Sequence, residues 1–293
     1  SLFPSIRSSS LMSEYSDPSS EHIVLDGNGP ARALPFGTYP LTDVQKKIRK
    51  VFFNTPLGYS RLRRPFMERF KNDCASGPVD ASLFGLKVRF YPQDNQTDAK
   101  SAVCGVCYNH RELKWLRRHL PKGGTFVDVG ANMGFFSLYA AQREARVIAV
   151  EPNPVLFEPL TTNMRLNGMR AHLLRVAVGD QEGSAQLVQV NGDVGGGRIG
   201  AGQGAAVRIH PLVDILQACD VTAVHVLKID IEGYEDRALL PFFREAPATL
   251  WPDHLIMEDT EHGRWAQDIF PVLRRCGYER RSRSRGNILL SRF

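Results

Sequence analysis

The 293-residue sequence lacks a long hydrophobic segment. No apolar run approaches the roughly 18–20 residues that a membrane-spanning helix needs. The N-terminal residues also lack the charged-then-apolar pattern of a secretion signal. The hydrophobic content of 43% and the charged content of 23% are instead typical of a globular protein. We therefore predict no membrane span and expect the protein in the cytoplasm.

Cysteine is scarce, and the five cysteines are scattered along the chain: Cys74, Cys104, Cys107, Cys219 and Cys276. An odd number at wide spacings does not predict a disulfide framework. Cys104 and Cys107 form a single C-x-x-C, without the second pair or the nearby histidine that a zinc site needs. We expect a structural role for this pair, with a redox or metal role as the alternative, and we predict no metal site.

Acidic residues are outnumbered by basic ones, which gives a net charge of +6. The basic residues gather in two regions, "KKIRK" with "RLRRPFMERFK" (46–71) and "RRCGYERRSRSR" (274–285). In both regions arginines alternate with apolar residues, as on the solvated face of a helix or strand. We favour solvated faces over a site for nucleic acid or another acidic partner.

Residues 1–35 lack any apolar period and are rich in serine and proline, so we expect a disordered N-terminal segment. Residues 36–115 are expected to form a helical and β extension that caps the site. Its first helix, near 42–54, starts at Thr42 or Asp43 and has an apolar stripe. Either the main domain or a second copy of the chain must cover this stripe, which allows a homodimer.

Residues 116–293 show a regular alternation of strand and helix patterns. The predicted strands are 125–130, 146–151, 171–179, 224–231 and 254–259, and the predicted helices are 134–143, 153–167, 235–245 and 263–276. This order predicts an α/β, Rossmann-like domain with a mostly parallel sheet, closed by an edge hairpin at 278–293. The glycine-rich segment 192–204 is interpreted either as a lid over the site or as disorder.

The stretch "FVDVGANMGFFSLYAAQREARVIAVEPNP" (126–154) places a glycine turn and an acid at the ends of two strands. A dinucleotide-binding turn would need glycines at the positions of Asn132 and Phe135. Asp128 would repel a diphosphate but suits a cationic ligand. Glu151 can accept hydrogen bonds from two ribose hydroxyls. The pattern therefore favours S-adenosyl-L-methionine over NAD, and a nucleotide-dependent oxidoreductase is the weaker interpretation.

Several blocks together resemble a known family. "GGTFVDVGANMGFFSLYAA", "VIAVEPNP", "NMRLNG", "RVAVGDQEG" and "VLKIDIEGYE" follow one another as in the FkbM-type methyltransferases, which are similar to the wider class I S-adenosylmethionine-dependent methyltransferases. The resemblance runs from about residue 85 to residue 293. It implies a seven-stranded sheet with an antiparallel last strand and S-adenosyl-L-methionine as the cofactor.

The resemblance also implies roles for individual positions. The methionine end of the cofactor would be lined by Asp128, Gly130, Ala131, Asn132 and Gly134. The ribose and its surroundings would be held by Glu151, Pro152 and Asn153. The adenine would be bordered by the segment from Ala177 to Asp180. Two segments before the sheet, 94–98 and 108–112, resemble positions that close over the cofactor.

Methyl transfer to a hydroxyl needs alignment and a base that takes the proton. Asp230 is the first catalytic candidate and Glu232 the second, because both follow a strand that should end beside the methyl group. The alternative role for Glu232 is to cap the following helix. His262 is a further candidate base, with a solvated or capping role as its alternative.

The expected acceptor is a small molecule or a glycan, and the family resemblance suggests a hydroxyl on a sugar or secondary metabolite. The basic clusters also permit an RNA acceptor. A third interpretation is a non-catalytic scaffold that binds the cofactor.

Overall fold

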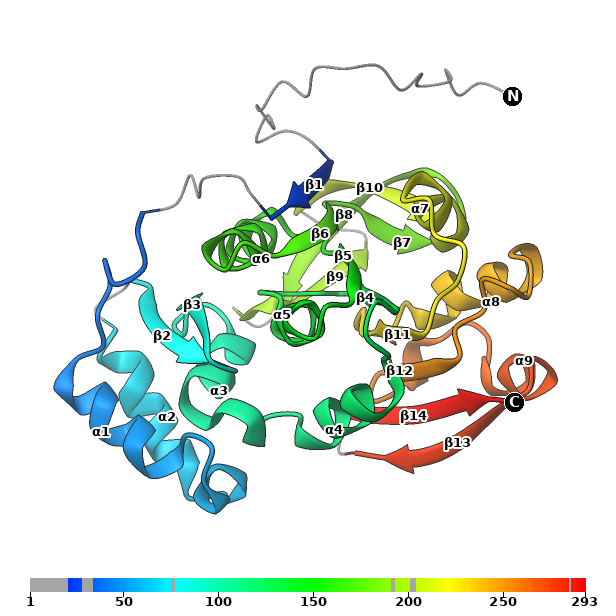
Figure 1. Ribbon diagram of the computed structural model, residues 1–293. Coiled ribbons are helices and arrows are strands. Elements are labelled where there is room, and N and C mark those ends of the chain that lie inside the picture. Colours follow the sequence, from blue (N-terminus) through cyan, green and yellow to red (C-terminus); the bar gives the residue numbers. More distant parts are fainter. Residues whose placement is uncertain (1–20, 28–33, 75–76, 191–192, 201–203, 285) are drawn as a thin grey trace.

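The computed structural model describes residues 21–27, 34–74, 77–190, 193–200, 204–284 and 286–293. An eight-stranded sheet flanked by helices forms the main part of these residues, and a helical extension lies to one side of it (Figure 1). Within the same ranges, no helix is both long enough and apolar enough to cross a bilayer.

The main sheet has the strand order β1-β6-β5-β4-β11-β12-β14-β13. Its strands are β1 (His22–Asp26), β4 (Thr125–Val129), β5 (Arg146–Val150), β6 (Arg170–Leu174), β11 (Val226–Ile229), β12 (His254–Glu258), β13 (Tyr278–Arg283) and β14 (Asn287–Arg292). The five strands from β6 to β12 are parallel, whereas β14 runs antiparallel to both of its neighbours. The predicted Rossmann-like sheet with an antiparallel last strand is confirmed for the seven strands β4–β6 and β11–β14.

The eighth strand, β1, was not predicted. It pairs antiparallel with β6 and lies within the segment expected to be disordered, so that expectation is wrong for His22–Asp26. The reason is local alternation: Ile23 and Leu25 pack against the core, while Val24 faces solvent. The rest of the predicted disordered segment, at 1–20 and 28–33, lies outside the described residues.

Helices cover both faces of the sheet. One face carries α4 (His110–His119), α5 (Phe135–Gln142) and α6 (Pro154–Leu166), and the other carries α7 (Leu212–Ala218), α8 (Glu235–Glu245) and α9 (Phe270–Arg275). Side chains of β4 point alternately to the two faces of the sheet and so contribute to the hydrophobic core on each face. Phe126 packs on the first face and Val127 on the second. The helix predicted at 263–276 begins only at Phe270, since Asp236 accepts the backbone N–H groups of Ala266 and Gln267.

The N-terminal extension shares the core of the main domain. It consists of α1 (Asp43–Phe52), the 3-10 turn η1 (Pro56–Tyr59), α2 (Arg63–Asn72), β2 (Val79–Leu83), β3 (Leu86–Phe90), α3 (Gln96–Cys104) and the 3-10 turn η2 (Gly105–Cys107). Thr42 and Gln45 form a capping box at α1, which confirms the predicted start. Ile48 and Phe52 of α1 are buried in the same core as Phe126, so the main domain covers part of that stripe, while Val51 of α1 is 46% exposed.

Two asparagines of α6 join the extension to the main domain. The side-chain oxygen of Asn163 accepts the N–H of Arg89 at 2.8 Å, and its amide nitrogen donates to the Arg89 carbonyl at 3.2 Å. Asn167, one turn later, makes the same pair of bonds with Lys87 at 2.9 and 2.7 Å. These amides therefore replace a neighbouring strand along the edge of β3.

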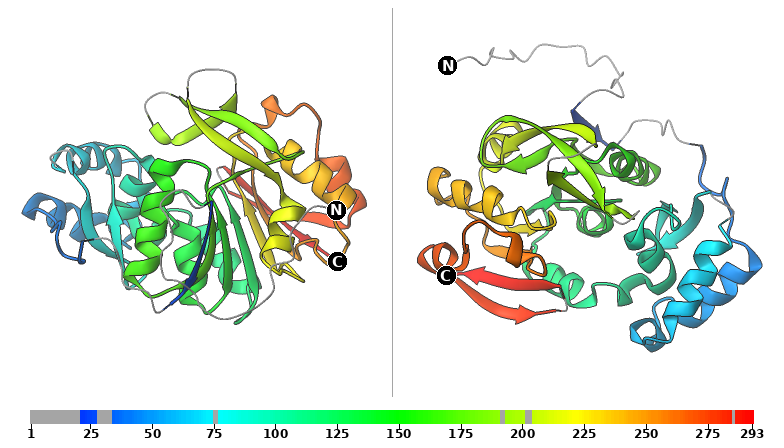
Figure 2. Two further views of the ribbon diagram at one scale, coloured as in Figure 1. Left: turned by 90° about the horizontal axis from the view of Figure 1, so that it is seen from above. Right: turned by 180° about the vertical axis from the view of Figure 1, so that it is seen from behind.

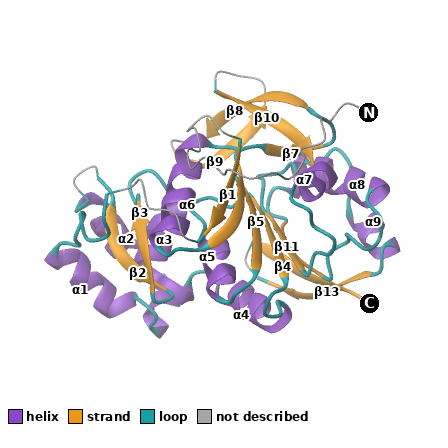
Figure 3. Ribbon diagram, turned by 45° about the horizontal axis from the view of Figure 1, so that its top comes forward, coloured by secondary structure: helices purple, strands orange, loops and turns teal. Residues whose placement is uncertain are grey.

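A second sheet of four strands lies on the side of the molecule away from α4 and β13 (Figure 3). Its order is β7 (Ala177–Gly179), β10 (Ala205–Pro211), β8 (Gly183–Val190) and β9 (Asp193–Gly200). The single strand predicted at 171–179 is thus divided between the two sheets. The glycine-rich segment is mostly strand β9, paired with β8, and not a loop (Figure 2); residues 191–192 and 201–203 lie outside the described residues.

Candidate functional site

A cleft of about 240 Å³ opens beyond the carboxyl ends of β4, β5 and β11. The order of the strands along the chain reverses between β4 and β11, and ligands of open α/β sheets bind at such a point. The strand ends supply Gly130, Glu151, Lys228 and Asp230 to the lining. Further lining comes from the extension, with Gln96, Thr97, Lys100, Tyr108 and Asn109, and from the second sheet, with Leu187, Gly197 and Ile199.

The glycine turn after β4 is held by backbone contacts. Gly130 and Ala131 both donate their N–H groups to the carbonyl of Val150, at 2.9 and 3.0 Å. Gly130 has φ = +76°, and a Cβ there would lie 1.9 Å from the carbonyl oxygen of Asp230. A glycine is therefore required by the packing of this turn against the end of β11.

Glu151 lies at the end of β5 with only 5% of its surface exposed, and it lines the cleft. One carboxyl oxygen accepts the N–H of Asn132 at 2.8 Å, and the other accepts the N–H of Asn153 at 2.9 Å. Burial raises the pKa of Glu151 to about 7, although the two backbone N–H groups oppose the shift. A carboxylate has about four acceptor positions, so two hydroxyls can still bind here.

Asn132 connects the glycine turn to the extension. Its backbone is left-handed, with φ = +53°, and its side-chain oxygen accepts the N–H of Met133 at 2.7 Å. The same oxygen accepts a hydrogen bond from the side-chain amide of Asn95, at the start of α3. The backbone of Asn132 thus contacts Glu151, and its side chain contacts the segment that closes the cleft.

Lys228 lies at the centre of a buried charge network. Its ammonium group donates to the carbonyl of Gly130 at 2.7 Å and lies 3.6 Å from Asp128 and 3.7 Å from Asp230. Burial alone would lower the pKa of Lys228, but Asp230, Asp128 and Glu151 together raise it above the usual value. Lys228 therefore carries its proton at neutral pH and joins the ends of β4 and β11.

Asp128 was predicted to line the methionine end of the cofactor, but it lies beneath the cleft, 1% exposed and outside the lining. It accepts a hydrogen bond from Ser137 at 2.7 Å and faces Lys228. Burial raises its pKa, and Lys228 and Ser137 oppose that shift. Its contacts position Lys228 and α5.

Asp230 and Glu232 both reach the cleft, as expected. Glu232 has a left-handed backbone, with φ = +58°, and lies 3.6 Å from the guanidinium of Arg198 on β9. Burial raises the pKa of Glu232. The structure gives α8 (N-cap Tyr234) no side-chain capping hydrogen bond, so the alternative capping role for Glu232 is not observed. Glu235, the first residue of α8, instead accepts the N–H groups of Ile231 and Gly233, in the turn before the helix, at 2.9 and 3.4 Å.

The remaining predicted positions divide into two groups. The cleft lining includes Ala131, Asn132, Pro152, Asn153 and Ala177. The lining does not include Gly134, Asp180 and His262. Gly134 lies at the start of α5, and Asp180 and His262 are exposed. The ring nitrogen Nδ1 of His262 is 2.6 Å from the carbonyl of Asp259, which holds the imidazole on its own turn.

The extension contributes more residues to the lining of the cleft than the sequence pattern had predicted. The structure brings Gln96, Thr97, Tyr108 and Asn109 to the lining, as the resemblance of 94–98 and 108–112 implied. The ring of Tyr108 packs edge-on against Phe135, 5.1 Å between centroids, and burial raises the pKa of its hydroxyl. Lys100 and Leu187 of the lining carried no sequence signal, whereas Gly197 and Ile199 belong to the glycine-rich segment for which a lid over the site was one interpretation.

A family model described as "Methyltransferase FkbM domain" matches residues 128–280. The chain belongs to this family. The match covers the strand ends that build the cleft floor, and membership of the family implies S-adenosyl-L-methionine as the cofactor. NAD binding, the weaker interpretation of the glycine turn, is not supported by the family.

The curated relative matches only a short segment, and the solved structures match at low sequence identity. Methyltransferase sdnD of Sordaria araneosa is 43% identical over 51 residues, which are 17% of this chain and 20% of that protein. A Pyrococcus abyssi tRNA (uracil-54, C5)-methyltransferase, solved with S-adenosyl-L-homocysteine, is 14% identical, with a TM-score of 0.41, over 73% of this chain and 43% of that one.

A Thermus thermophilus 16S rRNA N2 G1207 methyltransferase, solved with AdoMet and guanosine, is 15% identical, with a TM-score of 0.44, over 73% and 50% of the two chains. The chain thus spans about a fifth of the curated relative it matches and half or less of these two structures. At these identities and scores, neither structure bears on the acceptor of this chain.

The side chains of the cleft fit S-adenosyl-L-methionine. Glu151 offers acceptors for ribose hydroxyls at the end of β5. An apolar wall suited to a purine ring is made by Leu156, Val176, Val178, Leu187 and Ile199. The acids Asp230 and Glu232 lie at the end of β11, where negative charge complements a sulfonium and an ammonium.

Proposed function

We propose that the protein is an S-adenosylmethionine-dependent O-methyltransferase whose acceptor is a hydroxyl on a sugar or secondary metabolite. The observation that carries the proposal is the position of Asp230: its side chain is 38% exposed and lines the cleft, while Lys228 lies 3.7 Å behind it. A carboxylate placed in this way can accept the proton of a hydroxyl. The family match supports the methyltransferase part of the proposal.

Glu151, Pro152 and Asn153 would hold the nucleoside part of the cofactor. When bound, S-adenosyl-L-methionine supplies a methyl group that is already activated by a sulfonium. The two backbone N–H groups on Glu151 fix the plane of its carboxyl, so that its free acceptor positions face the cleft lining. Gly130 and Ala131, fixed to Val150, complete the wall on the β4 side.

Asp230 would take the proton from the acceptor hydroxyl as the new C–O bond forms. Lys228 cannot serve as the base, because its pKa is raised and it remains protonated. Its ammonium instead holds the Asp230 carboxylate in place and balances its charge. Glu232, paired with Arg198, would position the acceptor beside Asp230.

Residues of the extension and of β9 would exclude water from the reaction. Tyr108 and Thr97 lie against the cleft from the extension, and Ile199 lies against it from the second sheet. Exclusion of water matters here because a sulfonium methyl group also reacts with competing nucleophiles. These residues would also limit the size of the acceptor.

The test is a methyl-transfer assay with isotope-labelled S-adenosyl-L-methionine and a panel of sugars, lipid-linked glycans, hydroxylated metabolites, peptides and RNA. We expect label on an oxygen of a sugar or metabolite, and calorimetric binding of S-adenosyl-L-homocysteine without binding of NAD. Label on RNA or on peptide alone would contradict the proposed acceptor. Binding of S-adenosyl-L-homocysteine with no transfer to any class of acceptor would favour the scaffold interpretation.

A further inference from the structure

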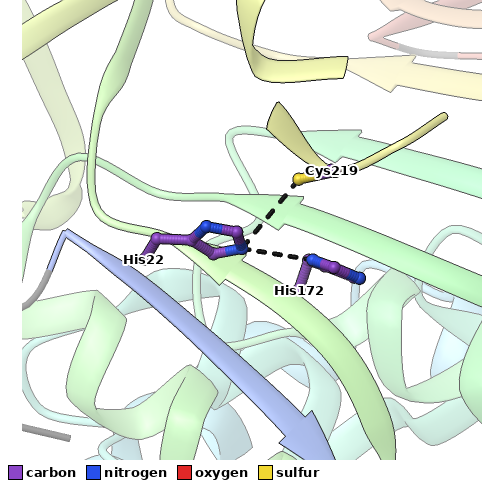
Figure 4. Close-up of side chains that lie close together, drawn as sticks. All are labelled: His22, His172 and Cys219. Carbon is purple, nitrogen blue, oxygen red and sulfur yellow. Dashed lines mark hydrogen bonds between the residues drawn. The ribbon is translucent and has the colours of Figure 1, made fainter. Parts of the chain in front are cut away.

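Two histidines and a cysteine that are distant in sequence come together at the edge of the main sheet. His22 lies on β1, His172 on β6, and Cys219 directly follows α7 (Figure 4). Nε2 of His22 is 3.1 Å from Nδ1 of His172 and 4.0 Å from Sγ of Cys219. The three candidate ligand atoms all lie within 4.8 Å of one another. None of these residues lines the cleft.

The strand register explains how the two histidines meet. Val24 of β1 lies opposite His172 of β6, and His22 lies opposite Leu174. Side chains two residues apart on a strand share one face, so His22 is the diagonal neighbour of His172. Their side chains are only partly buried, which leaves the pair accessible from the edge of the sheet.

The cysteine is brought to the same place by the end of α7. Cys219 is fully buried, and its carbonyl accepts a hydrogen bond from the guanidinium of Arg146 on β5. Arg146 also donates to the carbonyl of Asp220, at 3.1 Å. The thiol is therefore presented by a turn that is fixed to the sheet, as a preformed ligand site requires.

The ligand chemistry is that of a zinc site. Zinc binds imidazole nitrogen at about 2.0–2.1 Å and thiolate sulfur at about 2.3 Å, so a tetrahedral ion separates its ligand atoms by roughly 3.3–3.6 Å. The distances of 3.1 and 4.0 Å bracket this range. Imidazole nitrogen and thiolate sulfur are both ligand types that zinc takes in proteins.

We propose that His22, His172 and Cys219 form a zinc-binding site, with solvent completing the tetrahedron. On binding, the Cys219 thiol loses its proton to solvent as the Zn–S bond forms, and the hydrogen bond between the two imidazoles is replaced by two Zn–N bonds. Asp220, adjacent to the site, adds negative charge that favours a cation. Burial raises the pKa of the Cys219 thiol to about 11 and the charge of Arg146 opposes that shift, so the proton must be displaced by formation of the Zn–S bond.

The site would attach an added strand to the family core. His22 lies outside the segment matched by the family model, whereas His172 and Cys219 lie inside it. In the described residues, β1 is bonded to the main sheet on one side only, through β6. A metal at this point would therefore hold β1 on the sheet, independently of the cofactor or of methyl transfer.

The experiment is a titration of the metal-free full chain with Co²⁺, followed by displacement with Zn²⁺. We expect one equivalent of Co²⁺ to give visible d–d bands and a near-ultraviolet band from thiolate-to-metal charge transfer. Cys219→Ser should abolish the charge-transfer band, and His22→Gln should weaken Co²⁺ binding at least about tenfold. Cys276→Ser is the matched control and should leave both signals unchanged, because Cys276 lies outside the cluster.

Thermal unfolding gives an independent readout. Zn²⁺ should raise the Tm of the wild type and of Cys276→Ser, and it should leave the Tm of Cys219→Ser and His22→Gln unchanged. Circular dichroism of the metal-free variants establishes that they fold, and His22→Gln changes only a partly buried side chain at the sheet edge. Absence of Co²⁺ binding, or equal binding by all variants, would overturn the proposal and leave a hydrogen-bonded cluster.

Discussion

The floor and the roof of the cleft are built in different ways. The floor, defined as Gly130, Glu151, Lys228 and Asp230, lies at strand ends and is fixed by backbone hydrogen bonds and by the buried Lys228 network. The roof comes from the extension and from β9, and at the cleft it contacts residues next to the floor through side chains: Asn95 bonds to Asn132, and Arg198 pairs with Glu232. The floor is thus suited to holding the cofactor, and we expect the roof to contact the acceptor.

The largest effect on activity is expected from Asp230→Asn. Loss of the base should lower kcat by roughly 10²–10⁴-fold, the range that general bases contribute. Affinity for S-adenosyl-L-homocysteine should fall much less than kcat, because Glu151 still holds the ribose and only the negative charge that faces the ammonium group is lost. Steady-state kinetics and calorimetry check both values, with the exposed Asp253→Asn as the control. Full activity in Asp230→Asn would remove this residue from catalysis.

The rigidity of the floor predicts a strong effect of Gly130→Ala on stability. The left-handed backbone costs a non-glycine residue roughly 1–2 kcal/mol, and the added Cβ would also meet the Asp230 carbonyl at 1.9 Å. We expect a loss of about 3 kcal/mol or more in the free energy of unfolding, measured with urea.

Gly134→Ala is the matched control for this effect. Its φ of +92° carries a similar backbone cost, but the nearest atom to a new Cβ is the end of the Leu160 side chain at 2.8 Å, which can move. A loss of only about 1–2 kcal/mol is expected. Equal losses in the two variants would show that contact with Asp230 does not fix the floor.

Glu151→Gln should weaken binding of S-adenosyl-L-homocysteine by roughly 10–100-fold, since a hydrogen bond to a charged group contributes about 1.5–3 kcal/mol. The exposed acid Glu144, at the opposite end of β5, provides the control Glu144→Gln. Calorimetry measures both affinities. An affinity for Glu151→Gln within twofold of the wild type would contradict the role of Glu151 in holding the ribose.

The raised pKa of Glu151 predicts two pH dependences of opposite sign. Folding raises this pKa from 4.5 to about 7. Between these two pH values, the carboxyl therefore binds more protons in the folded protein than in the unfolded chain. The contribution to stability is fully present below pH 4.5 and is lost as the pH rises through 7. Affinity for S-adenosyl-L-homocysteine should instead rise through pH 7, because the ionised carboxylate accepts the ribose hydroxyls. Glu151→Gln should abolish both dependences.

Much of the floor could be predicted from the sequence, because acids and glycines at strand ends mark the ligand edge of a parallel sheet. The pattern could not separate residues that face the cleft from residues beneath it, and Asp128 belongs to the second group. It also could not show that Glu235, three residues after Glu232, accepts the backbone N–H groups of Ile231 and Gly233 in the turn before α8. Both distinctions depend on side-chain direction after a strand ends.

The roof was harder to predict, since the local sequence pattern of its elements is weak. Glycine-rich β9 has weak strand propensity, and pairing with β8 overrides it. The segment of α3 has little helical periodicity, and the Asn95 cap together with burial of Val103 stabilises it. The cluster of His22, His172 and Cys219 could not be predicted from the sequence, because its three residues are distant from one another in the chain.

The smallest effect, and the sharpest test of the comparison, is expected from Arg198→Ala. Arg198 joins β9 to Glu232 and Glu261 at 3.6 and 3.3 Å, and partly exposed ion pairs contribute only about 0.2–1 kcal/mol. The KM for the acceptor should therefore rise a few-fold, while affinity for S-adenosyl-L-homocysteine stays within twofold.

Arg208→Ala removes a comparable ion pair of the same sheet, with Glu182, away from the cleft and should change neither value. If Arg198→Ala instead weakened S-adenosyl-L-homocysteine binding as much as Glu151→Gln, the roof would hold the cofactor as firmly as the floor. The assignment of the cofactor to the floor and of the acceptor to the roof would then be wrong. The ion pair of Arg198 on β9 would in that case be as important for the cofactor as the carboxyl of Glu151, which backbone N–H groups hold at the end of β5.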